Sequence, residues 1–182
     1  MARFFASWGA YVVDADRVAR DVVAPGGPAY DVVVERFGRS ILAGDGTIDR
    51  VELGRIVFDN AAEREALEAI LHPVIREESK RRFTEQAGDA PLGIFEASLL
   101  VETGAHEDFD CLIVVACEPQ TQIARLIERD GLGEDDARKR IAAQYPLEKK
   151  IALADHVIDT DGSLEQTELQ ARAVWDVLTG GD

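Results

Sequence analysis

The sequence is poor in the residues that build covalent or metal-centred frameworks. Its 182 residues include only two cysteines, Cys111 and Cys117, and three histidines. Two cysteines exclude a disulfide-rich scaffold and a paired-cysteine zinc motif, and they suit a reduced, cytoplasmic protein. Both cysteines flank one short apolar run, so we expect them to act as small, buried apolar side chains.

Positive charge and long apolar runs are also scarce. Twenty lysines and arginines stand against 35 aspartates and glutamates, which gives a net charge of -15 and a pI near 4.6. Because such a field repels phosphates, we expect no nucleic-acid partner and no binding to an anionic membrane. No apolar run approaches the ~20 residues of a membrane span, and no signal-peptide pattern is present. The sequence therefore predicts a soluble protein.

What the chain does contain is enough apolar material for one well-filled core, at 46% of its residues. Short apolar runs predict buried strands at four places: 10–15, 92–97, 111–116 and 156–160. The segments between these runs have helical periodicity. Strands that alternate with helices predict an α/β fold with a parallel sheet covered on both faces.

The helical segments carry start and stop signals. "MARFFASWGA" resembles the second half of an amphipathic helix, and "APGGP" divides 17–34 into two short helices. Pro73 lies within a helical pattern and predicts a new helix start or a kink. Pro119 and Gly131 bracket another helix. The last helix is predicted over 163–178, with three apolar side chains directed inward: Leu164, Leu169 and Val174.

Acidic residues follow the predicted strands, where ligands bind in parallel sheets. They are Asp14, Asp16, Glu96, Glu118 and Asp159. Each one taken alone is well explained as a turn or cap residue. Asp14 and Asp16 are harder to dismiss, because two positions apart on an extended segment they face the same side. A carboxylate there can accept a proton from a substrate hydroxyl or help to hold Mg²⁺.

The cations gather in one region. Gln122, Arg125 and Arg129 share one helix face, and after a Gly-x-Gly break come Arg138, Lys139 and Arg140, with Gln144 four residues beyond. A mobile segment that brings arginines over a phosphoryl group has this pattern. The alternative is a solvated helix surface with ion pairs along it. His72, just before Pro73, is either a functional group or a structural histidine.

Six stretches, in order, resemble the signatures of the dephospho-coenzyme A kinase family. They are "GAYVVDADRVARDVVAPGGPAY", "ERFGRSILAGDGTIDR", "LEAILHPVIREE", "EASLLVETG", "RDGLGEDDARKRIAAQ" and "ADHVIDTDGSLE", and the match runs from Ala2 to about Leu178. The resemblance implies a P-loop nucleotide-kinase fold. It implies ATP-dependent phosphorylation of the 3'-hydroxyl of dephospho-coenzyme A, with Mg²⁺, in the last step of coenzyme A synthesis. It also implies a single kinase-like domain over 1–182, with a helical substrate subdomain at 17–85 and a lid at 131–144.

The resemblance assigns roles to individual residues. Asp16 matches the aspartate regarded as the base for the acceptor hydroxyl, and Asp14 matches its partner. The other substrate-side positions are Arg20, His72 and Glu102. Arginines that face the ATP phosphates match Arg125, Arg129 and Arg140, of which Arg125 and Arg140 are also taken as catalytic. Gln144 matches the glutamine that closes the lid motif.

The chain departs from the family pattern at three side chains. In "EASLLVE", Glu96 stands where the family usually has aspartate and Ser98 where it has proline. Thr160 stands where the family commonly has asparagine. We expect the Glu96 carboxylate still to reach the metal region, and the resemblance makes Glu96 the candidate Mg²⁺ ligand.

The largest departure is that no Gly-x-x-x-x-Gly-Lys-Ser/Thr loop occurs within residues 1–182. This loop and the central strand before it would precede Ala2 in the family. Without their phosphate-binding groups we expect weak or no kinase activity from the 182 residues, and unpaired strand edges favour a homo-oligomer over a monomer. One hypothesis is a longer natural chain with a GTG start codon. The alternatives are a non-catalytic relative that binds coenzyme A precursors or a protein partner, and a different nucleotide kinase.

Overall fold

The computed structural model describes residues 1–58 and 60–181, and its elements form two compact units. Residues 10–97 make one unit, and residues 1–9 together with the chain from Ser98 onward make the other. The four predicted strands are all present: β1 (Tyr11–Asp14), β2 (Gly93–Glu96), β3 (Ile113–Ala116) and β4 (His156–Asp159). They pair in parallel, β1 with β2 and β3 with β4, which confirms the predicted α/β class.

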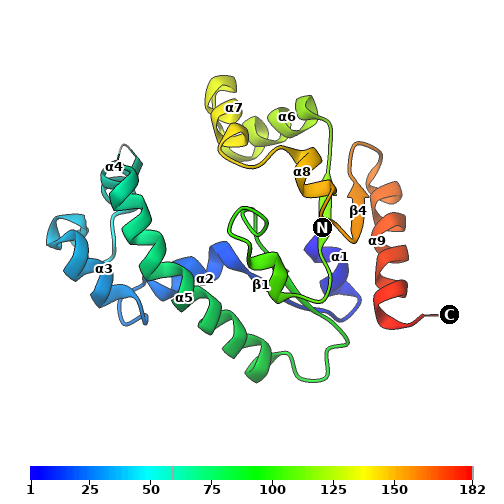
Figure 1. The fold of residues 1–182 in the computed structure, drawn as a ribbon, viewed down its shortest axis with the longest axis horizontal. Helices are drawn as coiled ribbons and strands as arrows, with labels where there is room; N and C mark the ends of the chain where they lie inside the picture. The colour runs from blue at the N-terminus through cyan, green and yellow to red at the C-terminus, as the bar shows by residue number, and fades with distance from the viewer. Residues whose placement is uncertain (59, 182) are drawn as a thin grey trace. The chain divides into compact units, whose positions relative to one another are not determined.

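In the unit of residues 10–97, helices surround the β1–β2 pair. Tyr11 is the register partner of Gly93, and Asp14 is the partner of Glu96. The helices are α2 (Ala15–Val22), α3 (Tyr30–Phe37), the 3-10 helix η1 (Arg39–Ile41), α4 (Arg50–Phe58) and α5 (Ala61–Gln86). The predicted break at "APGGP" separates α2 from α3. The long helix α5 contacts both α2 and β1 (Figure 1).

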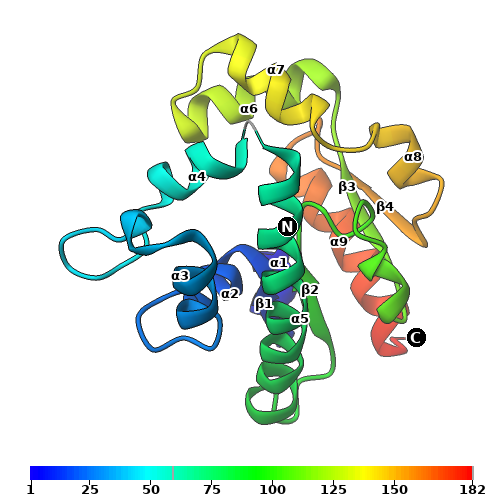
Figure 2. The ribbon, with the colours of Figure 1, turned by 60° about the vertical axis from the view of Figure 1, so that its left-hand side comes forward.

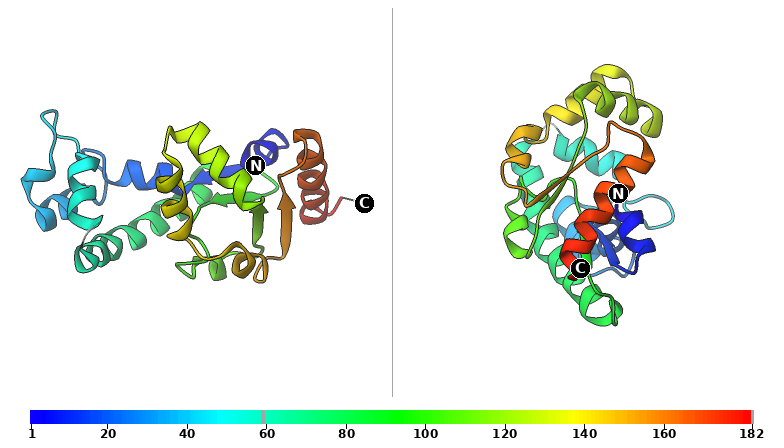
Figure 3. Two further views of the ribbon diagram at one scale, coloured as in Figure 1. Left: turned by 90° about the horizontal axis from the view of Figure 1, so that it is seen from above. Right: turned by 90° about the vertical axis from the view of Figure 1, so that its right-hand side faces the viewer.

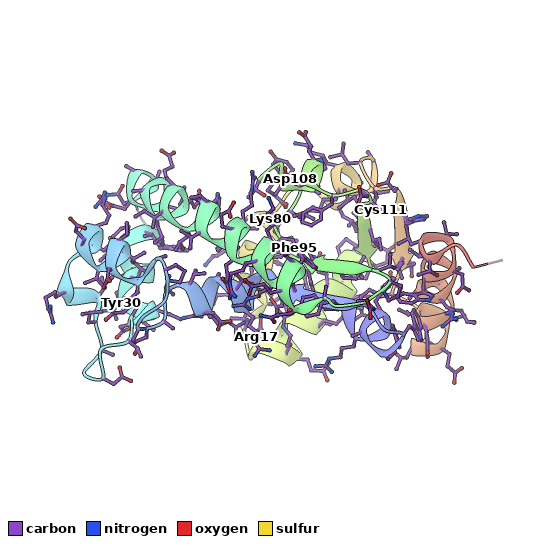
Figure 4. All side chains as sticks on the ribbon, turned by 90° about the horizontal axis from the view of Figure 1, so that it is seen from below. Arg17, Tyr30, Lys80, Phe95, Asp108 and Cys111 are labelled. Carbon is purple, nitrogen blue, oxygen red and sulfur yellow. The ribbon has the colours of Figure 1, made fainter. Side chains whose placement is uncertain are left out.

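The core of this unit is built from small and β-branched side chains. Its buried members are Val13, Val18, Val22, Ala29, Val33 and Ile41. Val18 and Val22 lie one turn apart and so occupy the same face of α2. Phe95 of β2, labelled in Figure 4, packs against this cluster, as does Phe83 of α5. A side chain at Gly93 would place its Cβ 2.9 Å from the Phe83 ring, so only glycine allows this approach.

Helix α5 excludes one of the two alternatives predicted at Pro73, a new helix start. Pro73 begins no new helix, because α5 continues through it from Ala61 to Gln86. Proline has no N–H, so the carbonyl of Ala69 loses its helical hydrogen bond there. Apolar side chains on both sides of the proline pack against the core, and this packing outweighs one missing bond: Ile70, Leu71, Val74 and Ile75.

A charged network connects α5 with α2. Arg81 Nε and Nη2 and Arg82 Nε each donate to the Glu78 carboxylate at 2.8 Å, and Arg82 Nη2 donates to Asp21 Oδ2 at 2.8 Å. The Glu78 side chain is only 15% exposed. Hydrogen bonds from Arg81, then from Arg82, lower the pKa of Glu78 from 4.5 to about 2.

This network predicts a pH dependence of stability. A lowered carboxylate pKa stabilises the folded state above pH 4.5, and the contribution is lost as pH falls from 4.5 toward about 2. After allowing for solvent screening, we expect Glu78→Gln to cost about 1 kcal/mol at about pH 6 and almost nothing at about pH 2. Urea unfolding of both proteins at the two pH values measures this difference. An equal loss of unfolding free energy at the two pH values would show that Glu78 stabilises the fold by packing alone.

In the second unit, α9 (Leu164–Thr179) lies beside β4 (Figure 2). The β3–β4 pairing runs from Ile113 opposite His156 to Ala116 opposite Asp159. The helices are α1 (Ala2–Ser7), the 3-10 helix η2 (Ala105–Asp108), α6 (Pro119–Asp130), α7 (Glu134–Ala142), α8 (Leu147–Ile151) and α9 (Leu164–Thr179). Pro119 occupies the first turn of α6 and Gly131 ends it with φ 66°, as predicted.

The inward face of α9 differs from the predicted one. Val174 is buried as expected, but Leu164 is 73% exposed and Leu169 is 71% exposed. The buried face is instead made by Thr167, Ala171, Val174 and Trp175, spaced i, i+4, i+7 and i+8. Leu169 follows Thr167 by two residues, about 200° around the helix, and so points away.

Trp175 explains why this face was selected. Its ring lies 6.2 Å from Phe5 and 5.9 Å from Trp8, centroid to centroid, so that α1 packs on α9 (Figure 3). Aromatic clusters of this kind add to the free energy gained by burying apolar area. The predicted short helix at the start of the chain is thereby confirmed and placed. Within residues 1–58 and 60–181, no helix is long and apolar enough to cross a membrane.

Candidate active site

Asp14 and Glu96 are brought together at the carboxyl ends of β1 and β2. Their Cα atoms are register partners in the parallel pair, so the two side chains leave the same face of the sheet. Asp14 also caps α2, because its Oδ1 accepts hydrogen bonds from the N–H groups of Asp16 at 2.8 Å and Arg17 at 3.1 Å. The turn-and-cap interpretation of Asp14 is therefore confirmed, and Oδ2 is not used in the cap.

Asp16 does not lie on an extended segment with Asp14, and that expectation was wrong. Once Asp14 caps the helix, the chain turns at Ala15, and Asp16 belongs to the first turn of α2. The Asp16 carboxylate is exposed, and among the described residues it forms no hydrogen bond or ion pair. Arg20 lies one turn further and donates from Nε to the Asp16 carbonyl at 3.1 Å. The carboxylate is thus open to a ligand.

His72 is exposed on α5, directly before Pro73. No hydrogen bond or ion pair in the described part of the chain joins it to Asp14, Asp16 or Arg20. Its role in substrate binding stays a prediction.

Arg125 holds the turn that follows β4. From α6, its Nη1 donates to Thr160 Oγ1 at 2.7 Å and its Nη2 donates to the Thr160 carbonyl at 2.5 Å. Thr160 Oγ1 in turn donates to the Ala116 carbonyl at the end of β3, at 3.0 Å. Burial raises the pKa of the nearby Cys117 thiol, although the Arg125 charge opposes this. The threonine that departs from the family pattern therefore fixes this arginine.

Arg129 and Arg140 share one carboxylate. Asp130, at the end of α6, accepts from Arg129 Nε at 2.7 Å and from Arg140 Nη1 of α7 at 2.7 Å. The hydrogen bond from Arg129, with smaller contributions from the charges of both arginines, holds the pKa of Asp130 below its usual value. The two guanidinium groups are 68% and 56% exposed. They are positioned together while most of their surface faces solvent.

The neighbouring cations Arg138 and Lys139 form ion pairs within their own helix. Arg138 pairs with Glu134 at 2.6 Å, and Lys139 pairs with Asp136 at 3.2 Å, both within α7. These are the ion pairs that the solvated-surface interpretation predicted. Within this cluster, that interpretation fits Arg138 and Lys139, whereas Arg140 reaches across to α6.

Glu102 and Gln144 meet at a lysine that sequence reasoning did not identify. Lys150 Nζ of α8 lies 2.7 Å from Glu102 Oε1 and donates to Gln144 Oε1 at 2.9 Å. Glu102 Oε1 also accepts the Tyr145 N–H at 2.8 Å. Burial raises the pKa of Glu102, but the hydrogen bonds from Lys150 and Tyr145 outweigh it, so the pKa lies below its usual value.

Sequence reasoning missed both Lys150 and Asp130, and only Lys150 gave no recognisable signal. Lys150 stands in "LEKKI" beside an equivalent lysine, and only the fold shows that its neighbour is solvent-facing while Lys150 is 14% exposed. Asp130 could have been found from its position between Arg129 and the Gly-x-Gly break, since a helix C-terminus is an unfavourable place for a carboxylate unless cations surround it.

Comparison with known proteins places the chain in a family. The family model described as dephospho-CoA kinase matches residues 1–166. The chain belongs to the dephospho-CoA kinase family. A dephospho-CoA kinase from Geobacter metallireducens is 46% identical over 176 residues, which cover 96% of this chain and 88% of that protein. One from Streptomyces avermitilis is 43% identical, with 96% and 85% covered.

Solved structures share the fold of this chain. The crystal structure of TT1252 from Thermus thermophilus superimposes with a TM-score of 0.84 at 31% identity, covering 98% of this chain and 90% of that one. Dephospho-CoA kinase from Campylobacter jejuni gives a TM-score of 0.69 at 24% identity, covering 100% and 91%. The second likeness bears on the fold alone.

Proposed function

We propose that this chain carries the dephospho-CoA kinase reaction, transferring the γ-phosphoryl group of ATP to the 3'-hydroxyl of dephospho-CoA in coenzyme A biosynthesis. The observation that supports this most is the match of the family model over residues 1–166, together with relatives of that name at 46% and 43% identity. The reaction needs a base at the acceptor and positive charge at the phosphates. The chain offers candidates for both.

On the acceptor side, Asp16 is the proposed base. Its carboxylate is exposed and has no hydrogen-bond or ion-pair partner among the described residues, while Asp14 Oδ1 caps α2 and so places Asp16 in the first turn of that helix. An ionised carboxylate within reach of a hydroxyl can accept its proton as the oxygen attacks phosphorus. Arg20 and His72 are proposed to bind the remainder of dephospho-CoA.

On the nucleotide side, Arg125, Arg129 and Arg140 are proposed to face the ATP phosphates. Arginine stabilises the charge that spreads over the transferring phosphoryl group, and its fork matches phosphate geometry. Asp130 holds two of these guanidinium groups at one place without burying them. The segment 131–144 is proposed to act as the lid that carries Arg140.

Mg²⁺ is proposed to bind at the ends of β1 and β2. The paired Asp14 and Glu96 supply carboxylate oxygens, which suit a cation that takes one or two carboxylates and completes its shell with water and phosphate oxygens. When bound, the ion would neutralise phosphate charge.

A single substitution tests this metal site. We expect Glu96→Gln to raise the Mg²⁺ concentration needed for half-maximal transfer by about tenfold, since one anionic ligand is lost. Titration of Mg²⁺ at saturating nucleotide measures it, with Glu107→Gln, an exposed glutamate of η2, as the control. An unchanged Mg²⁺ requirement in Glu96→Gln would remove Glu96 from the site.

The proposed activity is tested in two forms of the protein. The 182-residue chain contains no Gly-x-x-x-x-Gly-Lys-Ser/Thr loop, so we expect it to bind dephospho-CoA but to transfer phosphate slowly. The extended chain, in which the strand and loop of a dephospho-CoA kinase precede Ala2, should transfer phosphate rapidly. Calorimetry measures binding, and chromatography of coenzyme A measures transfer. The alternative, a non-catalytic relative that binds coenzyme A precursors or a protein partner, predicts no transfer by either form.

Two further proposals concern the cellular compartment and the oligomeric state of the protein. Both cysteines are free thiols, which suits a cytoplasmic protein. Self-association remains the expected response to unpaired strand edges, and sedimentation of the 182-residue chain distinguishes a monomer from a homo-oligomer.

A further inference from the structure

Each N–H group of the Lys150 ammonium has an acceptor. Its ammonium has three N–H groups and three acceptors: Glu102 Oε1 at 2.7 Å, Gln144 Oε1 at 2.9 Å and the Ser98 carbonyl at 3.1 Å. The Lys150 side chain is 14% exposed and that of Glu102 is 12% exposed. This is a largely desolvated ion pair, unlike the exposed pairs of α7.

The three acceptors come from two separate segments. Ser98 and Glu102 belong to the turn after residue 97, whereas Gln144 ends the segment that contains α7. The Tyr145 N–H, directly after Gln144, donates to the same Glu102 oxygen that receives Lys150. Lys150 and Glu102 thus fasten the chain at the C-terminal end of residues 131–144.

At the other end of that segment, the ion pair between Arg140 and Asp130 is more exposed than the pair between Lys150 and Glu102. Gly131 and Gly133 flank the break before α7, and a side chain at either would meet nothing within 4 Å. Gly131 adopts φ 66°, a conformation that glycine reaches without strain. The contrast predicts a segment that is loose at its start and fixed at its end.

We propose that Lys150 is a positioning residue for the nucleotide: it fixes the pivot about which residues 131–144 move, and thereby sets where Arg140 meets the phosphates. This inference rests on the proposed function, because it takes 131–144 to be the lid. Lys150 acts through Gln144 and Glu102 and need not touch ATP itself.

The test must avoid leaving a buried charge without a partner. Lys150→Met alone would strand the Glu102 carboxylate and could unfold the chain. In K150M/E102Q both members are neutral, and the new glutamine can still accept the Tyr145 N–H. E102Q alone is the reference, so that the comparison isolates Lys150. Lys149→Met is the matched control, because Lys149 lies over the Tyr145 ring and, among the described residues, makes no hydrogen bond to Glu102, Gln144 or Ser98.

Four quantities separate positioning from a structural role. In K150M/E102Q against E102Q, we expect amide exchange at 141–145 to rise about tenfold and the Kd for ATP to rise about tenfold, within the usual range of couplings between linked elements. The Kd for dephospho-CoA and the Tm should stay unchanged. Lys149→Met should leave all of them unchanged.

Different results would overturn the role of Lys150 and the proposed function. Unchanged exchange and unchanged ATP affinity in the double variant would overturn the proposal, and so would equal weakening of both ligands together with a lower Tm, which marks a structural role. If the parent chain bound neither ATP nor dephospho-CoA, the proposed function would fail, and the role of Lys150 toward a nucleotide with it. The exchange measurement would still show whether Lys150 fixes the segment.

Discussion

Replacing Asp16 with asparagine is expected to lower the rate of phosphoryl transfer by the extended chain by about 10²- to 10⁴-fold, the range that a general base contributes. The affinities for ATP and dephospho-CoA should change little, because the amide has the shape of the carboxylate. The Asp16 carboxylate takes part in no hydrogen bond or ion pair among the described residues, so its loss breaks no contact in the fold. Single-turnover kinetics, with both ligands saturating, measures the step itself.

The control for this substitution is Asp31→Asn. Asp31 is also exposed and also lies in the first turn of a helix, α3, so that it matches Asp16 in local setting. It should retain the parent rate. A rate for Asp16→Asn within about threefold of the parent would remove Asp16 from the proposed role, since a lost base costs far more.

Replacing Arg140 with methionine is expected to lower the transfer rate by about 10²- to 10³-fold, the cost of removing one group that stabilises developing charge. Arg140 is 56% exposed and its ion pair with Asp130 is near the surface, so the free energy of unfolding should change by less than about 1 kcal/mol. Rapid-quench kinetics measures the rate, and urea unfolding verifies the fold.

Arg138→Met is the matched control for Arg140. Both arginines lie on α7 two residues apart, but Arg138 pairs with Glu134 of its own helix, whereas Arg140 reaches Asp130 of α6. We expect Arg138→Met to retain the parent rate. Equal losses in the two variants would mean that total positive charge on α7, rather than one placed guanidinium, supports the reaction.

The sequence was sufficient for the strands and for the pairing of two acidic residues, Asp14 and Glu96, at the carboxyl ends of β1 and β2. Strands such as β3 and β4 are short apolar runs, and Gly131 is a clear helix stop, so local chemistry decided these features. The position of Asp14 was also predictable, because an aspartate between a strand and a helix can end the strand and cap the helix.

Tertiary packing decided what the sequence did not. The pattern of α9 offers more than one apolar face, and only the aromatic contact between Trp175 and α1 selects the one that excludes Leu164 and Leu169. Pro73 is tolerated because apolar side chains of α5 pack against the core on both sides of it, and local sequence preferences do not indicate this packing. In the candidate site, the role of Lys150 could not be predicted from the sequence, because only its burial distinguishes it from the adjacent Lys149.

We propose that this chain directs a phosphoryl group to a ribose hydroxyl of dephospho-CoA. The most direct measurement is ³¹P NMR of the extended chain mixed with ATP, Mg²⁺ and dephospho-CoA. We expect one new phosphomonoester resonance from a 3'-phosphate, formed in equal amount with ADP, and its disappearance in Asp16→Asn. ADP accompanied only by inorganic phosphate, or a spectrum that does not change, would contradict it.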